Sequence, residues 1–294
     1  MTPEPAGSGS DNDERHWSDD RFLHHLDRLQ GTHRGPVVVV ESTGSTNADV
    51  ADQAAQGAPA GFTIVSHEQV NGRGRLDRQW VSPPGAGVAM SILVRPAVPV
   101  SRWGWLPLLA GLGVVAACAD VGLTVTLKWP NDVIVESVGA DGRPGPRKLG
   151  GILVERVDGA ADGHGAAGVI GIGLNIDLSV DELPTNVASS LRLEGVRVDR
   201  ELVVVRILDR VMTSVDEWAA AGGDVHACGA LSRYQNSCST IGQRIRVEQP
   251  GGSVLTGVAL DIDQSGGLIV DVGNGESVMV TAGDVVHVRA TTQL

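Results

Sequence analysis

The sequence predicts an α+β protein with a larger unit that mixes helices and strands and a small all-β unit after it. Two observations support this class. Up to about residue 238, apolar runs typical of strands are interrupted by segments of helical periodicity, and beyond it apolar residues alternate with polar ones. The chain has 294 residues, 42% of them hydrophobic, enough for a buried core. We predict an N-terminal tail over 1–35, a mixed unit over 36–238 and a β-unit over 239–294.

The N-terminal tail is predicted to be flexible, with one short helix. Residues 1–15 are rich in Pro, Gly, Ser and acidic side chains, which cannot bury enough apolar surface to order the chain. Phe22, Leu26 and Leu29 recur at helical spacing within residues 17–30, and Gly31 can end that helix. The tail is too short for an additional DNA-reading domain.

In the mixed unit, short apolar runs bounded by polar knots predict strands over 37–40, 62–66, 88–94, 124–129, 133–136, 149–156 and 169–176. Helical periodicity and capping residues predict helices over 45–56, 101–121, 201–221 and 227–235. The second helix is apolar nearly all round, so we expect it to be buried. Residues 139–147 are predicted to form a loop.

The β-unit is predicted from strict alternation in two runs. Val254, Thr256, Val258, Leu260 and Ile262 form the first, and Leu268, Val270 and Val272 repeat the pattern. Glycine pairs separate the runs, as expected for tight turns between antiparallel strands. The unit has about 55 residues.

Composition excludes several classes of protein. The 23 Lys and Arg against 35 Asp and Glu give a net charge of −12, which disfavours binding to DNA or RNA. No run reaches about 18 apolar residues without a polar interruption, so no transmembrane helix is expected, and the N-terminus lacks the basic and apolar regions of a signal peptide. The three cysteines, Cys118, Cys228 and Cys238, form no C-x-x-C pair, which predicts a reduced, cytoplasmic protein without disulfides or a zinc knuckle.

The first candidate for chemistry is a loop that carries Gly72-Arg73-Gly74-Arg75, with Arg78 close behind. Glycines let a backbone approach anionic groups, and arginines present rigid donor forks that suit phosphate or carboxylate. The alternative is an ordinary solvated basic loop.

The second candidate is Lys128-Trp129-Pro130-Asn131-Asp132 between two predicted strands. Trp129 can wall a flat ligand, Lys128 supplies a point charge, and Asp132 can hold Mg²⁺ through water. The alternative is an ordinary turn, which Pro-Asn-Asp favours by itself.

Three further motifs allow two interpretations each. Gly150 and Gly151 follow Lys148 and mark either a close approach by a ligand or a β-bulge. The run 171–175 (GIGLN) lacks the third glycine and the helix of a dinucleotide fingerprint, so Rossmann binding is not expected. Ser45-Thr46-Asn47 is either a helix cap or a hydrogen-bonding site, and the two are compatible.

Taken together and in order, STN, QVNGRGR with W-x-S-P, KWPND, KLGGILVE and GIGLN, followed by a β-unit, resemble the biotin–protein ligases. The resemblance spans roughly residues 37–290 and is to the short type without an N-terminal DNA-binding domain. It implies a mixed-sheet catalytic domain of the biotin/lipoate ligase type and a C-terminal SH3-like domain.

The resemblance also implies the reaction and the partners. Biotin and Mg²⁺·ATP give biotinyl-5′-AMP, and a lysine of a biotin carboxyl carrier domain then displaces AMP. The carrier is expected to belong to an acyl-CoA carboxylase. We expect a cytosolic monomer or weak homodimer that binds neither DNA nor membranes. The alternatives are a lipoate or octanoate ligase or transferase of the same fold, and a non-catalytic biotin-binding regulator.

Matched position by position, the resemblance assigns biotin contacts to Ser45, Thr46, Asn47, Gln69, Arg73, Gly74, Arg75, Lys148 and Gly151. It assigns nucleotide contacts to Arg73, Trp80, Lys128, Asn131 and Asn175, and the metal side to Asp132. The catalytic positions are Arg75, Lys128 and Lys148.

We expect Arg73, Arg75, Lys128 and Lys148 to converge on one cavity, because two anionic substrates must meet there. Asp77 stands where the family usually has a small residue. An acidic side chain beside a phosphate-binding loop is expected to weaken retention of the adenylate.

Overall fold

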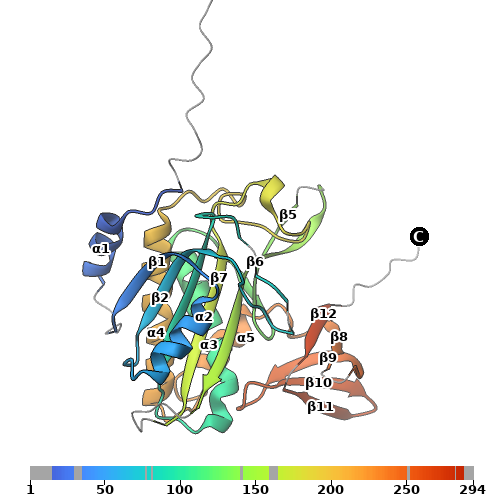
Figure 1. Ribbon diagram of the computed structural model, residues 1–294. Coiled ribbons are helices and arrows are strands. Elements are labelled where there is room, and N and C mark those ends of the chain that lie inside the picture. Colours follow the sequence, from blue (N-terminus) through green and yellow to red (C-terminus); the bar gives the residue numbers. More distant parts are fainter. Residues whose placement is uncertain are drawn as a thin grey trace, which may run out of the picture.

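The computed structural model describes residues 15–29, 35–76, 78–80, 82–139, 142–158, 165–249, 252–281 and 283–287 (Figure 1). A seven-stranded mixed sheet with helices on both faces forms the larger unit, and a five-stranded antiparallel sheet forms the smaller one. The predicted α+β class is confirmed.

The larger sheet has the strand order β1-β2-β3-β7-β6-β5-β4. β1 and β2 run parallel, and the other neighbouring pairs run antiparallel. The strands are β1 Val37–Thr43, β2 Thr63–Gln69, β3 Gly87–Val94, β4 Thr126–Lys128, β5 Asp132–Val138, β6 Pro144–Val157 and β7 Ala167–Asn175.

Helices cover both faces of this sheet, which explains why its central strand β3 is buried at every position. Ile64 and Leu93 pack under α2 (Thr46–Ala55), whereas the alternate residues Val65 and Ile92 belong to the larger core on the opposite face. The helices of that second face are α3 (Leu106–Asp120) and α4 (Arg200–Ala220) (Figure 1). The sheet therefore separates two cores, and α2 alone marks the face that carries the candidate site.

Helix α3 is apolar all round because it lies between the sheet and α4. Pro107 stands at its start, as predicted, and the 3₁₀ helix η1 (Val100–Trp105) precedes it. Gly113 permits the close crossing with α4, since a Cβ there would lie 2.6 Å from Cγ2 of Val211. The span Val100–Asp120 has the length and composition of a membrane helix, but it is mostly buried inside the protein.

The smaller unit has the strand order β11-β10-β9-β8-β12, with every neighbouring pair antiparallel. This agrees with the SH3-like unit expected from the resemblance. A short helix, α5 (Ala230–Ser237), leads into it. The strands are β8 Arg244–Glu248, β9 Val254–Ile262, β10 Leu268–Gly273, β11 Glu276–Val280 and β12 Asp284–His287.

Two tryptophans join the units. Nε1 of Trp105 donates to the carbonyl oxygen of Asp263 at 3.0 Å, and Nε1 of Trp129 donates to that of Gly266 at 3.1 Å. Trp129 is only 2% exposed, but it lines a cavity together with Arg75 and Asn131, so a role as the wall of a flat ligand stays a prediction. The turn that carries Trp129 also holds the smaller unit beside the sheet through the hydrogen bond to Gly266.

Several predicted boundaries needed correction. The loop over 139–147 is shorter than expected, because β6 begins at Pro144 and pairs there with Val138 of β5. Strands β1 and β2 extend beyond their apolar runs, since Ser42 pairs with Glu68 and Thr43 with Gln69. Polar residues thus continue the ladder toward the candidate site.

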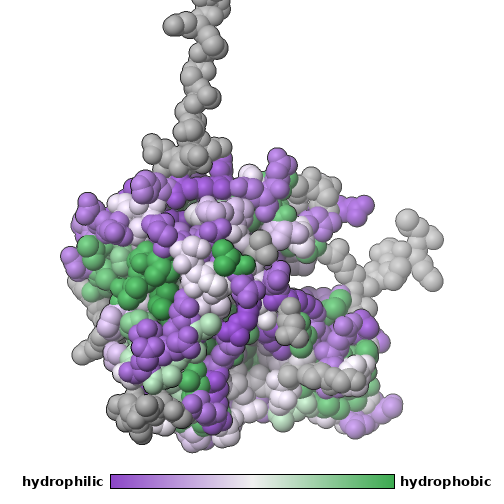
Figure 2. All heavy atoms as spheres, viewed as in Figure 1, coloured by the Kyte–Doolittle hydropathy of each residue, from purple (hydrophilic) through white to green (hydrophobic). Residues whose placement is uncertain are grey.

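The N-terminal segment differs most from its prediction. Its helix forms, as α1 (Asp19–Asp27), but residues 15–27, which we call the N-terminal strap, pack against the larger unit instead of forming a free tail. Trp17 and Phe22 are buried and belong to the main core. Figure 2 shows hydrophobic surface over α1 and β1, where Leu23 and Val38 are exposed. Residues 1–14 and 30–34 of the predicted tail lie outside the described residues.

The strap is held by an ion pair whose strength depends on pH. Arg15 lowers the pKa of Glu182 from 4.5 to about 2, so this pair stabilises the fold above pH 4.5 and ceases to do so as the pH falls toward about 2. Both side chains are partly exposed, which screens the interaction.

Replacing Glu182 by glutamine is therefore expected to lower the free energy of unfolding at pH 7 by about 1 kcal/mol. The difference between variant and wild type is expected to shrink steadily below pH 4.5, because the wild-type carboxylate becomes neutral. Urea unfolding of both proteins at several pH values measures this. A difference that stayed constant with pH would contradict the assignment.

Candidate active site

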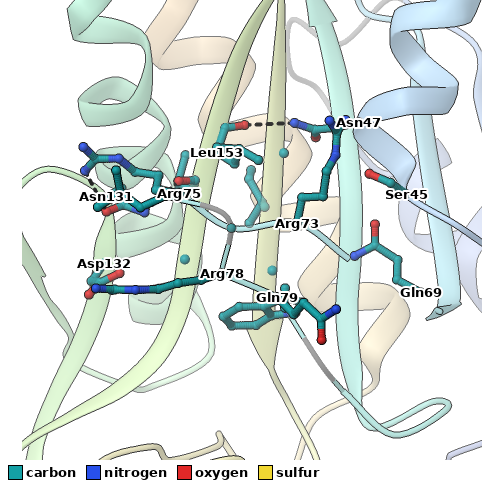
Figure 3. Close-up of a pocket in the computed structure, with 18 of the residues that line it drawn as sticks. Ser45, Asn47, Gln69, Arg73, Arg75, Arg78, Gln79, Asn131, Asp132 and Leu153 are labelled. Carbon is teal, nitrogen blue, oxygen red and sulfur yellow. Dashed lines mark hydrogen bonds between the residues drawn. The ribbon is translucent and has the colours of Figure 1, made fainter. Parts of the chain in front are cut away.

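A cavity lies on the α2 side of the sheet, where α2 begins and the loop after β2 crosses over β6 and β7 (Figure 3). Both units contribute to its walls, since Gly283 and Asp284 reach it from the smaller unit. The walls consist of Ser45, Thr46, Asn47, Gln69, Arg73, Gly74, Arg75, Leu76, Arg78, Gln79, Trp80, Asn131, Asp132, Lys148, Gly151, Ile152, Leu153, Gly171, Ile172, Gly173, Gly283 and Asp284.

One end of the cavity is a neutral polar pocket around the first turn of α2. Oε1 of Gln69 accepts hydrogen bonds from the backbone N–H of Thr46 at 2.8 Å and from its Oγ1 at 3.1 Å. Ser45 occupies the N-cap position, but its side chain makes no capping bond. Ser45 is thus the cap residue by position, as predicted, and Gln69 satisfies part of the helix end in place of its side chain.

Asn47 connects this pocket to the sheet. Its Oδ1 accepts a hydrogen bond from Oγ of Ser91 at 2.6 Å, and its Nδ2 donates to Glu155 at 2.6 Å and to the carbonyl oxygen of Leu153 at 3.3 Å. These bonds fix the buried amide in one orientation.

Glycines make room on the floor of the cavity. A Cβ on Gly171 would lie 2.0 Å from Oδ1 of Asn47, and one on Gly173 would lie 2.4 Å from Cε2 of Trp80. A larger residue at either position would displace a wall of the cavity. The two glycines of the run 171–175 thus permit the close approach of protein side chains, those of Asn47 and Trp80.

A β-bulge explains why Lys148 and Gly151 both line the cavity. In regular alternation, residues three apart face opposite sides of a sheet. The register between β5 and β6 shifts where Gly150 pairs with Val133 and Lys148 pairs with Ile134. The intervening residue, Leu149, is fully buried. The bulge predicted as one alternative is thus present.

The other end of the cavity is cationic. Nζ of Lys148 donates to Oδ1 of Asp132 at 2.6 Å and lies 5.8 Å from the centre of the Trp80 ring. Arg78 pairs with Asp284, whereas Arg73 lies toward the α2 end, where it contacts Glu155 at 3.3 Å.

Arg75 is the most enclosed cation of the loop. It donates to Oδ1 of Asn131 at 3.3 Å and to the carbonyl oxygen of Gly283 at 3.2 Å. Burial lowers the pKa of Arg75, whereas Asp284 raises that of Arg78, and an arginine keeps its charge at neutral pH in either case. Figure 3 shows Arg75 beside Asn131, with Arg73 extending toward Asn47 and Arg78 toward Asp132.

The structure brings most of the predicted residues together. Arg73, Arg75 and Lys148 converge on the cavity as expected, and the other predicted positions that line it are Ser45, Thr46, Asn47, Gln69, Gly74, Trp80, Asn131, Asp132 and Gly151.

Two predicted residues do not line this cavity. Lys128 pairs with Asp132 across the β4–β5 hairpin, and its charge acts on His287 of the smaller unit, whose pKa is lowered by burial and by Lys128. Three of the four expected cations line this cavity, and the convergence of Lys128 on it stays a prediction. Asn175 is 3% exposed, and its Nδ2 donates to the carbonyl oxygen of Ser189 at 2.9 Å. Asp77 lies outside the described residues.

Sequence reasoning missed the acidic partners. Glu155 follows the KLGGILV run directly, but its contact with Arg73 needs the loop to fold across β6. Asp284 comes from the smaller unit, and no local pattern predicts which of its turns faces the site.

No set of three or more His, Cys, Asp or Glu side chains suited to a metal occurs within the described ranges. Asp132 alone provides a carboxylate beside Lys148. That suits Mg²⁺ arriving with substrate phosphates, because this ion usually takes one or two protein carboxylates and keeps its other ligands.

Two family models match the chain. The biotin/lipoate A/B protein ligase family matches residues 39–175, and the biotin protein ligase C-terminal domain matches residues 240–288. The mixed sheet with its cationic cavity thus belongs to the ligase class that the first model describes, and the smaller unit corresponds to the second.

Curated relatives agree. The chain is 38% identical to a biotin–[acetyl-CoA-carboxylase] ligase of Mycobacterium tuberculosis (strain ATCC 25618 / H37Rv) over 279 residues, which cover 92% of this chain and 96% of that protein. It is 30% identical to the bifunctional ligase/repressor BirA of Bacillus spizizenii (strain ATCC 23059 / NRRL B-14472 / W23) over 81% of this chain and 69% of that protein. The chain belongs to the biotin protein ligase family.

Solved structures share the fold. The biotin protein ligase of Aquifex aeolicus in complex with biotin and ATP matches with a TM-score of 0.68 at 21% identity, covering 86% of this chain and 99% of that one. The biotin protein ligase of Leishmania major in complex with biotinyl-5-AMP matches with a TM-score of 0.54 at 23% identity, covering 84% and 98%.

Proposed function

We propose that this chain is a biotin–[acetyl-CoA-carboxylase] ligase, which activates biotin with ATP and transfers it to a lysine of a carrier domain. The observation that carries the proposal is one cavity with a neutral polar end at α2 and a cationic end at Arg75 and Lys148. Family membership and the relatives' activity support it. The residue roles below are part of the proposal.

The neutral end suits the ureido ring of biotin, which offers one carbonyl acceptor and two N–H donors. Ser45, Asn47 and Gln69 present both kinds of group within hydrogen-bonding reach of the cavity. Glycines on the floor leave space for the bicyclic body, and Leu153 adds apolar surface.

The cationic end suits the first step, in which an oxygen of biotin's carboxylate attacks the α-phosphorus of Mg²⁺·ATP. A C–O–P bond forms, and the bond to the leaving pyrophosphate breaks. At about 4 Å and an effective dielectric constant near 20, each pair of unit charges repels with about 4 kcal/mol. Arg75 and Lys148 line the cavity where they can offset this repulsion. No protein nucleophile is needed, because the substrate itself attacks.

The acidic partners define what the substrates must displace. Asp132 holds Lys148 and Glu155 holds Arg73. Phosphate and carboxylate oxygens of the substrates take over these donors on binding, which leaves the two carboxylates without their cations. Asp132 is then free to act toward Mg²⁺ on the phosphates.

In the second step, the neutral amine of a carrier lysine attacks the acyl carbon of biotinyl-5′-AMP. An amide forms, AMP leaves with the bonding electron pair, and the amine gives up a proton. We assign the acceptor to a biotin carrier domain of an acetyl-CoA carboxylase, which the name of the mycobacterial relative supports. We further propose a cytoplasmic location, which the free thiols of Cys118, Cys228 and Cys238 support.

The test measures exchange of labelled pyrophosphate into ATP, followed by mass spectrometry of a carrier domain incubated with biotin and Mg²⁺·ATP. We expect exchange that requires biotin and a carrier mass increase by one biotinyl group. Exchange that required lipoate instead would identify a lipoate ligase of the same fold. Biotin binding without exchange would identify a non-catalytic regulator.

The loop over 69–79 is predicted to tighten when its cations meet the substrates. In the free protein, the side-chain contacts of Arg73 and Arg78 are largely exposed to solvent. Biotin with ATP is expected to slow amide hydrogen exchange in this loop, because closure excludes water from the acyl-adenylate. Equal exchange with and without substrates would remove the proposed closure.

A further inference from the structure

The N-terminal strap contacts a long connection that also contacts the candidate site. Between β7 and α4 the chain runs from Ile176 to Asp199 with one 3₁₀ turn, η2 (Val180–Glu182), as its regular structure. A connection of this length needs anchors from elsewhere to keep one conformation.

Arg15 of the strap provides such an anchor. Its Nη1 and Nη2 donate to the two carboxylate oxygens of Glu182, each at 2.7 Å. Its Nε donates to Oδ2 of Asp177 at 3.1 Å, and Nη2 also donates to the carbonyl oxygen of Asp177 at 2.7 Å. A planar guanidinium thus clamps both ends of the 177–182 turn, which a point charge could not do equally well.

The same connection holds the backbone of Lys148. The N–H of Lys148 donates to the carbonyl oxygen of Val187 at 2.7 Å, and its own carbonyl oxygen accepts from the N–H of Ser189 at 2.9 Å. Ser190 ties this stretch back to the clamped turn, since its Oγ donates to the carbonyl oxygen of Leu178 at 2.7 Å. An unbroken series of short contacts therefore leads from Arg15 to Lys148.

The strap itself is fixed firmly enough to serve as an anchor. The ring of Trp17 lies 5.1 Å from that of His67 and 5.4 Å from the guanidinium carbon of Arg200. The backbone N–H of Ser18 donates to Oε1 of Glu201 at 2.6 Å, and that carboxylate is 1% exposed. Burial of the indole and the buried acceptor hold the residues on the C-terminal side of Arg15 against α4.

We propose that Arg15 is a positioning residue for the adenylation step: it clamps the 177–182 turn and thereby fixes the backbone of Lys148 in the cavity. The role in adenylation rests on the function proposed above. The structural coupling between the strap and Lys148 is independent of that function. The biotin pocket at Ser45 and Gln69 belongs to other elements and is not part of this series.

The experiment compares Arg15→Ala with wild type by amide hydrogen exchange and by kinetics. We expect exchange at Lys148 and Ser189 to accelerate about tenfold, within the range of couplings carried by contact networks. We expect kcat of the biotin-dependent pyrophosphate exchange to fall about tenfold, because small misplacements of a reacting group are costly. The Kd for biotin measured without ATP is expected to rise by much less than kcat falls, because the ureido pocket is separate and only the contact of Lys148 with the carboxylate is disturbed.

The matched control is Arg28→Ala. Arg28 follows α1 and contacts the ring of His24, so its loss is expected to change none of these readouts. Arg15→Lys is expected to recover part of kcat, because it restores charge without the double clamp. Glu182→Gln keeps Arg15 and replaces Arg15→Ala as the test variant if that protein fails to fold. It is expected to change hydrogen exchange and kcat in the same direction, but by less.

Unchanged hydrogen exchange at Lys148 in Arg15→Ala and Glu182→Gln would overturn the proposal. So would a rise in the Kd for biotin as large as the fall in kcat, because that would indicate general damage to the site. A wild-type protein with no biotin-dependent pyrophosphate exchange would refute the proposed function. The comparison of amide hydrogen exchange would still decide whether the strap is coupled to Lys148.

Discussion

Replacing Lys148 by alanine is expected to lower the rate of biotin-dependent pyrophosphate exchange by about 10²–10³-fold, the usual cost of losing one electrostatic contact to the transition state. The ammonium group lies beside Asp132 and above Trp80, at the cationic end of the cavity. Its removal leaves the carboxylate of Asp132 facing two anionic substrates. We therefore expect the loss mainly in kcat, measured at saturating biotin and ATP.

Lys128→Ala is the informative control for this prediction. Lys128 lies on β4, two strands from the β6 strand of Lys148, and does not line the cavity. Its loss is expected to change the exchange rate by less than about threefold, as for a surface substitution away from the site. If Lys128→Ala lost as much activity as Lys148→Ala, the family-based assignment of Lys128 would be right and our placement of the cationic end would be wrong.

Replacing Arg75 by alanine is expected to reduce exchange by about 10²-fold and to let biotinyl-5′-AMP escape before transfer. Arg75 is the enclosed cation of the loop and links it to both units, through Asn131 and the carbonyl oxygen of Gly283. Its loss therefore removes charge and closure together. Quenched-flow measurement of free and bound adenylate separates the two effects.

Arg78→Ala is the matched comparison in the same loop. The Arg78 side chain is 63% exposed and pairs with one carboxylate, so its loss is expected to cost less than that of Arg75. Equal effects of the two substitutions would indicate that the loop acts only through its total charge. Normal adenylate retention in Arg75→Ala would contradict the proposed closure.

The fold was predictable where one physical signal dominated. The all-round apolar character of α3 predicted its burial on both sides, and the alternation of apolar and polar residues predicted the smaller unit. The signal failed where partners lie far apart in sequence. Trp17 is buried against residues of β2 and α4, so nothing near it in the chain reveals that the strap belongs to the core.

The candidate site divides in the same way. Residue type and spacing indicated the loop arginines, Lys148 and the α2 segment, because each motif carries its chemistry locally. Lys128 shows the limit of this reasoning. It stands directly opposite Asp132, and its charge lowers the pKa of His287 in the smaller unit, so the motif alone does not tell which of the two the ammonium group serves. The acidic partners Glu155 and Asp284 required the tertiary structure.

The pairing of acidic and basic side chains in the cavity has a consequence for selectivity among anions. A single phosphate or chloride ion would have to break a contact such as Lys148–Asp132 or Arg73–Glu155 for one new contact in return. A triphosphate can engage several donors at once, so each further exchange becomes intramolecular and far more favourable. We therefore expect the cavity to bind chelating polyanions in preference to single small anions.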